Sequence, residues 1–243
     1  MYPVLLRVGG FELTSFGVMV ALGALAGLWL FRRELARSHL PEAALDSAVV
    51  GLLCGIVGAK LLYVIEHLGQ EPFLTLLVSR SGLAWHGGLI GGVLGAGALM
   101  LARGWPVVPI LAAATPALAL GHAIGRIGCF LVGDDYGRVT TLPWGVAFPR
   151  GFPPTFERVH PAQIYEMVPL LALAALLVGW RRRGVSDRVV LGRYFVMVGA
   201  LRFLVEFVRI EPVVALGLTA AQWLALLLVV AGLALVVRRA PSA

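Results

Sequence analysis

The sequence of 243 residues contains little charge, few cysteines and no asparagine. Charged residues make up only 14% of it, and its two cysteines are Cys54 and Cys129. The scarcity of charge excludes an ordinary soluble domain, in which about a quarter of the residues are charged. Two cysteines so far apart argue against a disulfide framework or a thiolate zinc site, so no metal is predicted. The missing asparagine excludes an N-glycosylation acceptor.

Apolar residues are abundant instead. They make up 59% of the chain, and the mean hydropathy is +0.90. A helix needs roughly 20 apolar residues to cross about 30 Å of hydrocarbon, and a backbone in lipid must satisfy its own hydrogen bonds. We therefore predict an all-α integral membrane protein with a single membrane domain, residues 1–243. Its seven expected spans are 15–31, 47–65, 86–102, 107–125, 162–180, 192–209 and 219–237.

The loops between these spans predict the orientation. Ten basic residues fall in the loops on one side and five in those on the other. Basic loops stay in the cytoplasm, which places the N-terminus outside and the C-terminus in the cytoplasm. The same arginines explain the net charge of +7 without a nucleic-acid partner. Only Arg7 precedes the first span, so this span is expected to be retained and not cleaved as a signal peptide.

One connection is unusually long and polar. Residues 130–160, between spans four and five, are rich in glycine, proline and charge. Loops of this length are uncommon unless they are functional. We expect this segment to form a small extracytoplasmic cap over the spans.

Ionisable residues lie within or beside the apolar spans. In a membrane such residues are costly and mark functional sites. With the orientation above, most of them fall at the outer ends of their spans, which predicts a polar site near the outer leaflet. They are Lys60, Glu66, His86, His122, Arg126, Glu166, Arg202, Glu206 and Arg209.

The spacing of Arg202, Glu206 and Arg209 places all three on one helix face. Glu206 either neutralises the arginines as a structural residue or holds Arg202 to receive an anion. The planar guanidinium group binds phosphate with two parallel hydrogen bonds. Arg126 and Arg202, on separate helices, could therefore flank the phosphate of a phospholipid headgroup.

Three further features lie near these residues, and two of them allow two interpretations. The glycines at 87–95 favour close helix packing, while His86 before them is either structural or an acid–base group. Asp134 and Asp135 follow Arg126 closely enough to pair with it. Cys129 is either a lowered-pKa nucleophile or a buried small residue, and we favour the second.

At these residues the chain resembles the prolipoprotein diacylglyceryl transferase family. The resemblance runs through almost the whole chain and is most specific in four stretches, 86–91, 125–137, 160–166 and 202–209. It implies an enzyme that moves the diacylglyceryl group of phosphatidylglycerol to the lipobox cysteine of a prolipoprotein signal peptide. Glycerol phosphate would leave, and no cofactor is needed. The implied location is the bacterial inner membrane, with the site toward the outer leaflet.

The resemblance also implies roles by position. The catalytic residues would be His86, Arg126 and Arg202, with the arginines on the headgroup phosphate and His86 either activating the thiol or binding the headgroup. Substrate-binding roles would fall to Lys60, Asp134, Gly137, His160, Gln163, Tyr165, Glu166, Glu206 and Arg209.

The chain departs from the family pattern at three positions. Many members have tyrosine at the position of Phe16, asparagine at that of Cys129 and arginine at that of Lys60. These departures leave open a catalytically diverged relative that binds phospholipid or lipoprotein precursor without transfer. An intramembrane protease is disfavoured because no Gly-x-Ser-x-Gly motif surrounds a serine. A transporter is disfavoured because the ionisable groups gather at one membrane face and no repeat is visible.

Overall fold

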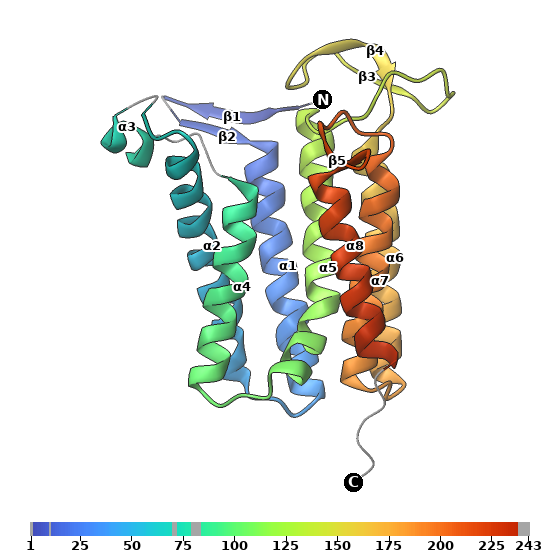
Figure 1. The fold of residues 1–243 in the computed structure, drawn as a ribbon. Coiled ribbons are helices and arrows are strands. Elements are labelled where there is room, and N and C mark those ends of the chain that lie inside the picture. Colours follow the sequence, from blue (N-terminus) through green and yellow to red (C-terminus); the bar gives the residue numbers. More distant parts are fainter. Residues whose placement is uncertain (1, 10, 70–71, 79–83, 238–243) are drawn as a thin grey trace. The chain divides into compact units, whose positions relative to one another are not determined.

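The computed structural model describes residues 2–9, 11–69, 72–78 and 84–237, and most of these are helical (Figure 1). Each predicted span falls largely within one of seven long helices. These are α1 (Ser15–Arg37), α2 (Leu45–Glu66), α4 (Trp85–Ala102), α5 (Val107–Val132), α6 (Ala162–Arg182), α7 (Asp187–Glu206) and α8 (Ala220–Val237). A 3-10 turn, Glu42–Ala44, precedes α2, and the short helix α3 covers Phe73–Val78.

Five of the long helices are apolar enough and long enough to cross a membrane. They are α1, α2 with its preceding turn, α5, α6 and α8. The apolar part of α4 is shorter, and α7 carries charged residues within its length. The helices therefore support a multi-pass membrane protein.

The described residues also form three small antiparallel hairpins, and these hairpins were not predicted from the sequence. They pair β1 (Val4–Val8) with β2 (Phe11–Thr14), β3 (Val146–Phe148) with β4 (Thr155–Val159), and β5 (Val213–Ala215) with β6 (Leu218–Thr219). In the last hairpin the turn residues Leu216 and Gly217 both have positive φ, 51° and 75°. Two such residues are typical of a tight two-residue hairpin turn.

The chain forms two compact units. The first consists of Met1–Phe31 and Leu111–Ala243, and the second of Arg32–Ile110. In the second unit α2 packs along α4 through facing glycines. A Cβ on Gly55 would lie 3.1 Å from the carbonyl oxygen of Gly88, and one on Gly92 would lie 3.1 Å from that of Gly51. The packing role predicted for the glycines of 87–95 is confirmed.

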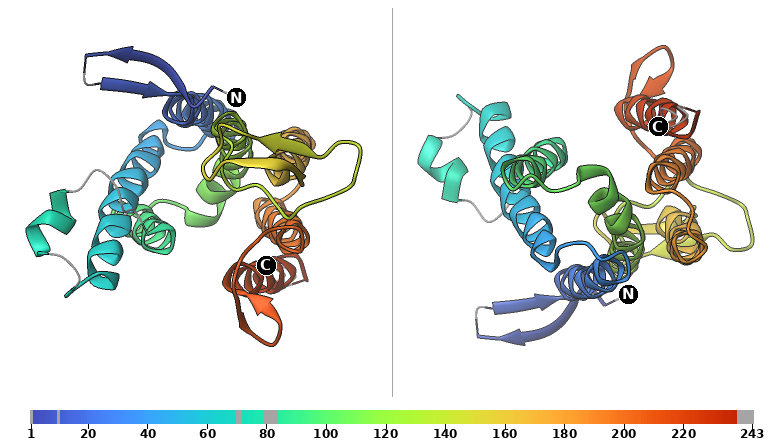
Figure 2. Two further views of the ribbon diagram at one scale, coloured as in Figure 1. Left: turned by 90° about the horizontal axis from the view of Figure 1, so that it is seen from above. Right: turned by 90° about the horizontal axis from the view of Figure 1, so that it is seen from below.

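In the first unit α7 lies between α6 and α8 (Figure 2). Small residues again allow backbones to approach. A Cβ on Gly199 would lie 2.7 Å from the carbonyl oxygen of Ala225, and one on Gly192 would lie 2.7 Å from that of Gly232. Close packing of this kind holds α7 and its charged residues firmly against α8.

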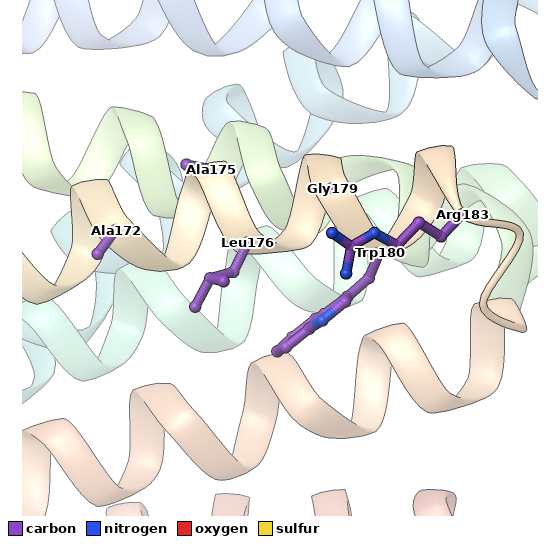
Figure 3. Close-up of a pocket in the computed structure, with 6 residues that line it drawn as sticks. All are labelled: Ala172, Ala175, Leu176, Gly179, Trp180 and Arg183. Carbon is purple, nitrogen blue, oxygen red and sulfur yellow. The ribbon is translucent and has the colours of Figure 1, made fainter.

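A shallow apolar depression covers the C-terminal half of α6 (Figure 3). It is lined by Ala172, Ala175, Leu176, Gly179, Trp180 and Arg183. Nearby, the guanidinium carbon of Arg193 lies 4.6 Å from the centre of the Trp180 ring. Glu166, the charged residue that α6 contributes to the predicted site, lies near the opposite end of this helix, so the depression is separate from Glu166.

Candidate functional site

Glu166, near the start of α6, connects two arginines from other helices. Its side chain is only 2% exposed. Oε2 lies 2.5 Å from Nε of Arg126 in α5, and Nη1 of Arg202 in α7 donates a hydrogen bond of 2.7 Å to Oε1. A buried carboxylate requires such partners, because an unpaired buried charge is strongly destabilising. Three helices therefore meet at Glu166, with Arg126 and Arg202 on one carboxylate.

Glu206, the last residue of α7, forms a second junction. Its side chain is fully buried, and Oε2 lies 2.9 Å from Nη2 of Arg202 and 3.6 Å from Nε of Arg209. The common helix face is confirmed for Arg202 and Glu206, while Arg209 contacts Glu206 from outside the helix. The predicted end of the span at 209 is wrong, because α7 ends at Glu206. Arg209 instead lies in the turn that follows and forms a bridge with Gly137 of the cap segment.

Asp135 pairs with both Arg126 and Arg209. Its Oδ2 accepts a hydrogen bond of 2.8 Å from Nη1 of Arg126, and its Oδ1 accepts one of 3.1 Å from Nη2 of Arg209. The predicted pairing of an aspartate with Arg126 is therefore confirmed for Asp135. The three acids and three arginines now form a closed circuit of alternating charge, which we call the charge ring. Its members are Arg126, Asp135, Arg209, Glu206, Arg202 and Glu166.

The charge ring is buried on one side and open on the other. The side chains of Glu166 and Glu206 have almost no exposed surface, whereas that of Asp135 is 43% exposed. Burial raises the pKa of Asp135, but Arg209 and then Arg126 lower it more strongly, so the pKa lies below its usual range. Asp135 is therefore ionised at neutral pH and balances the arginines at the accessible edge.

Asp134 takes no part in the charge ring. Its carbonyl oxygen accepts a hydrogen bond from Nε2 of Gln163, a buried residue of α6. Burial, and then the neighbouring charge of Asp135, raise the pKa of Asp134. The preceding Gly133 has φ +77° and ends α5, which extends to Val132 and so passes the predicted end of the span at 125. Asp134 and Gln163 therefore fix the turn that presents Asp135.

The cap segment is attached to the helices by predicted site residues. Nε1 of Trp144 donates a hydrogen bond of 2.8 Å to the Tyr165 hydroxyl, which also lies 3.1 Å from Nδ1 of His160. The N–H of Gly137 donates a bond of 2.8 Å to the His160 carbonyl. A Cβ on Gly137 would lie 2.9 Å from that of His160, so only glycine fits. These hydrogen bonds join the cap segment, through His160 and Tyr165, to the start of α6.

Cys129 is buried in α5 beside the charge ring. Its residue exposure is 8%, and Nη1 of Arg126 lies 3.8 Å from its Sγ. A buried position agrees with the interpretation of Cys129 as a small packing residue. With Asp134 and Asp135 it brings three potential metal-ligand atoms within 4.8 Å of one another. Because the carboxylate of Asp135 is already bound by two arginines, we assign no metal to this group.

Replacing Cys129 with serine is expected to leave transfer largely intact. The smaller, more polar hydroxyl would cost about 1–2 kcal/mol of stability through burial. It would not alter the ion pairs of Arg126. Turnover and melting temperature of the purified variant, compared with those of the unmodified protein, would check this. Complete loss of turnover in a folded variant would instead make Cys129 a participant in the reaction.

Four residues in or next to the charge ring were given no site role from the sequence. His122 is an ionisable residue four positions before Arg126, and its Nε2 lies 3.6 Å from Oε2 of Glu166. Its spacing of four residues from Arg126 could have placed it there. Asp135 was not assigned a role by position. Thr219 and Gln222 have the Thr-x-x-Gln spacing of a helix N-terminus, which is readable from sequence.

Two predicted site residues, His86 and Lys60, belong to the second compact unit. His86 is exposed in the first turn of α4, and the ammonium group of Lys60 lies 5.2 Å from the centre of the Tyr63 ring. Their roles in the site stay predictions.

Comparison with known proteins agrees with the resemblance in the sequence. A family model described as prolipoprotein diacylglyceryl transferase matches residues 3–238. Three similar proteins are all named as phosphatidylglycerol–prolipoprotein diacylglyceryl transferases. The Clostridium tetani protein is 35% identical over 217 residues, which is 87% of each chain. The Geobacter sulfurreducens protein is 36% identical, covering 91% of this chain and 86% of its own.

The third of these proteins, from Clostridium perfringens, is 30% identical over 241 residues, or 97% of this chain and 94% of its own. These matches cover 86–97% of the chains compared, and the family-model match, residues 3–238, spans the positions of the charge ring. This chain belongs to the prolipoprotein diacylglyceryl transferase family.

Proposed function

We propose that this protein transfers the diacylglyceryl group of phosphatidylglycerol to prolipoproteins, the reaction for which its relatives are named. The observation that carries the proposal is the charge ring, in which Arg126 and Arg202 share the carboxylate of Glu166. A transferase of this kind needs cations for a phosphate at the membrane surface. The ring supplies two of them from separate helices.

The two arginines are suited to bind the headgroup phosphate. Their side chains are 13% and 26% exposed, so both are partly accessible. A guanidinium group has five N–H donors. In the charge ring Arg126 uses Nε and Nη1, and Arg202 uses Nη1 and Nη2, which leaves further donors on each. The carboxylates hold the two guanidinium groups in place before the phosphate arrives, so less ordering is required on binding.

The transfer step follows from the chemistry of the two substrates. The thiolate of the lipobox cysteine attacks the glyceryl carbon that carries the phosphate ester. A carbon–sulfur bond forms, the carbon–oxygen bond breaks, and glycerol phosphate leaves with the bonding electrons. Negative charge that develops on the leaving phosphate is stabilised by Arg126 and Arg202. His86 is the proposed residue for accepting the thiol proton or binding the headgroup, and the pH profile of a His86→Gln variant separates these roles.

The membrane arrangement is part of the proposal. All seven long helices would cross the inner membrane of a bacterium, with the N-terminus outside and the C-terminus in the cytoplasm. The excess of arginine at the C-terminal ends of α1 and α6 and in the sequence after α8 supports this orientation. The charge ring, at the other ends of α5, α6 and α7, would then face the outer leaflet, together with the cap formed by the residues that follow α5.

A transfer assay tests this function. Purified protein in detergent would be given phosphatidylglycerol and a lipobox peptide with a single cysteine. We expect mass spectrometry to detect a diacylglyceryl adduct on the peptide, with glycerol phosphate released in equal amount. A peptide with serine in place of cysteine is the control and should form no adduct. Binding of both substrates without any adduct would identify a relative that has lost the chemistry, as the departures at Phe16 and Cys129 allow.

A further inference from the structure

The N-terminus of α8 adjoins the charge ring through Thr219. This residue and Gln222 form reciprocal hydrogen bonds. The N–H of Gln222 donates to Oγ1 of Thr219 over 3.2 Å, and the N–H of Thr219 donates to Oε1 of Gln222 over 3.0 Å. The pair is a capping box, which satisfies backbone donors at a helix start. Both residues are buried, with exposures of 8% and 3%.

The Thr219 hydroxyl makes a second contact that helix capping does not need. It donates a hydrogen bond of 2.7 Å to Oε1 of Glu206. A hydroxyl has one proton and two lone pairs, so it can donate to Glu206 while it accepts from Gln222. This bond occupies one oxygen of the Glu206 carboxylate. The other oxygen, Oε2, faces Arg202 at 2.9 Å and Arg209 at 3.6 Å.

These contacts constrain Glu206 from both sides. Its side chain has no exposed surface, so water does not replace a lost partner. Without the Thr219 hydroxyl, Oε1 would be a buried acceptor lacking its donor, which is unfavourable. The carboxylate would then rotate toward the arginines, and Arg202 would lose the defined orientation of its guanidinium group.

We propose that Thr219 is a positioning residue for the transfer reaction, acting through Glu206 on Arg202. The proposal rests on the function proposed above, because it assigns Arg202 to the donor phosphate. None of the sequence motifs that define the site includes Thr219. This residue lies in β6, ten residues beyond Arg209. Its role depends on the hydroxyl and not on the size of the side chain.

The test compares three variants in the transfer assay. Thr219→Val keeps the side-chain shape and removes the hydroxyl, and Thr219→Ser keeps the hydroxyl. Gln222→Met removes the capping bond from the Thr219 N–H to Oε1 of Gln222 but leaves the Glu206 contact. We expect Thr219→Val to lower kcat/KM for phosphatidylglycerol about tenfold, mainly through KM, as expected when a buried acceptor loses its donor. KM for the peptide should not change. Thr219→Ser should restore the unmodified value, and Gln222→Met should stay close to it.

The outcomes separate positioning from simple helix capping. An equal loss in Gln222→Met would overturn the proposal, because that variant removes only a capping bond. So would an unchanged KM for phosphatidylglycerol in Thr219→Val. If that variant does not purify as a folded protein, Thr219→Ala, which removes the same hydroxyl, replaces it with the same expectations. A protein that forms no adduct before any substitution would overturn the proposed function, and this inference with it.

A double-variant comparison adds a measurement of kcat/KM whose result would differ if the role of Thr219 were purely structural. If Thr219 acts through Glu206, the tenfold effect of Thr219→Val should largely disappear in a Glu206→Gln background. Independent, multiplying effects of the two substitutions would contradict the proposed path from Thr219 to Arg202.

Discussion

Replacement of Arg126 or Arg202 with alanine should lower the rate of diacylglyceryl transfer by a factor of about 10²–10³. Each guanidinium group is proposed to bind the phosphate and to stabilise the charge that develops on it as glycerol phosphate leaves. Each is also partly accessible and held by Glu166, so its loss removes an oriented donor group. The measurement is the rate of adduct formation by purified variants that elute as folded protein.

The control for this prediction is Arg193→Ala. Arg193 lies in α7 like Arg202, but it contacts the Trp180 ring and has no place in the charge ring. Its loss removes the same charge from the same helix and should leave transfer close to normal. Arg126→Lys serves as a second test, because lysine keeps the charge and lacks the planar fork, and it too should lose most activity. Normal turnover by Arg126→Ala or Arg202→Ala would refute the assignment of these residues to the phosphate.

Glu166→Gln should have the largest effect on stability. The substitution keeps the size of the side chain and removes the one charge that faces Arg126, Arg202 and His122. Loss of this buried carboxylate should cost up to about 3–5 kcal/mol, because Arg126 keeps only Asp135 and Arg202 only Glu206 as an acidic partner. The melting temperature in detergent should therefore fall clearly. Transfer should fall too, since the two arginines lose their common partner.

The matched control is Glu12→Gln. Glu12 pairs with Arg7 over 2.8 Å, but both side chains are more than half exposed. The same chemical change in an exposed pair should cost no more than about 1 kcal/mol. Equal melting temperatures for Glu166→Gln and the unmodified protein would mean that Glu166 does not stabilise the site, and would favour a role only in binding.

The helices of this protein follow from local properties of the chain. Apolar runs of about 20 residues and the need to pair every backbone group in lipid predict where helices occur, and seven helices lie at the expected places. The common face of Arg202 and Glu206 also follows from spacing alone, since it depends only on the 3.6-residue period, whereas Arg209 lies beyond the end of α7. Helix ends were less well predicted. Capping and turn geometry place them, as Gly133 does at the end of α5.

The partners of the charged residues were decided by the tertiary structure. Arg202 and Glu166 are 36 positions apart, and Arg209 and Asp135 are 74 apart. Contacts at such separations depend on how α5, α6 and α7 pack, which no local pattern encodes. The sequence identified the arginines of the site and the chemistry they suit. Only the packed helices determined that Glu166 lies between two of them, that Asp135 and not Asp134 completes the charge ring, and that Thr219 reaches Glu206. A buried charge selects whichever partner the fold brings within a few ångströms.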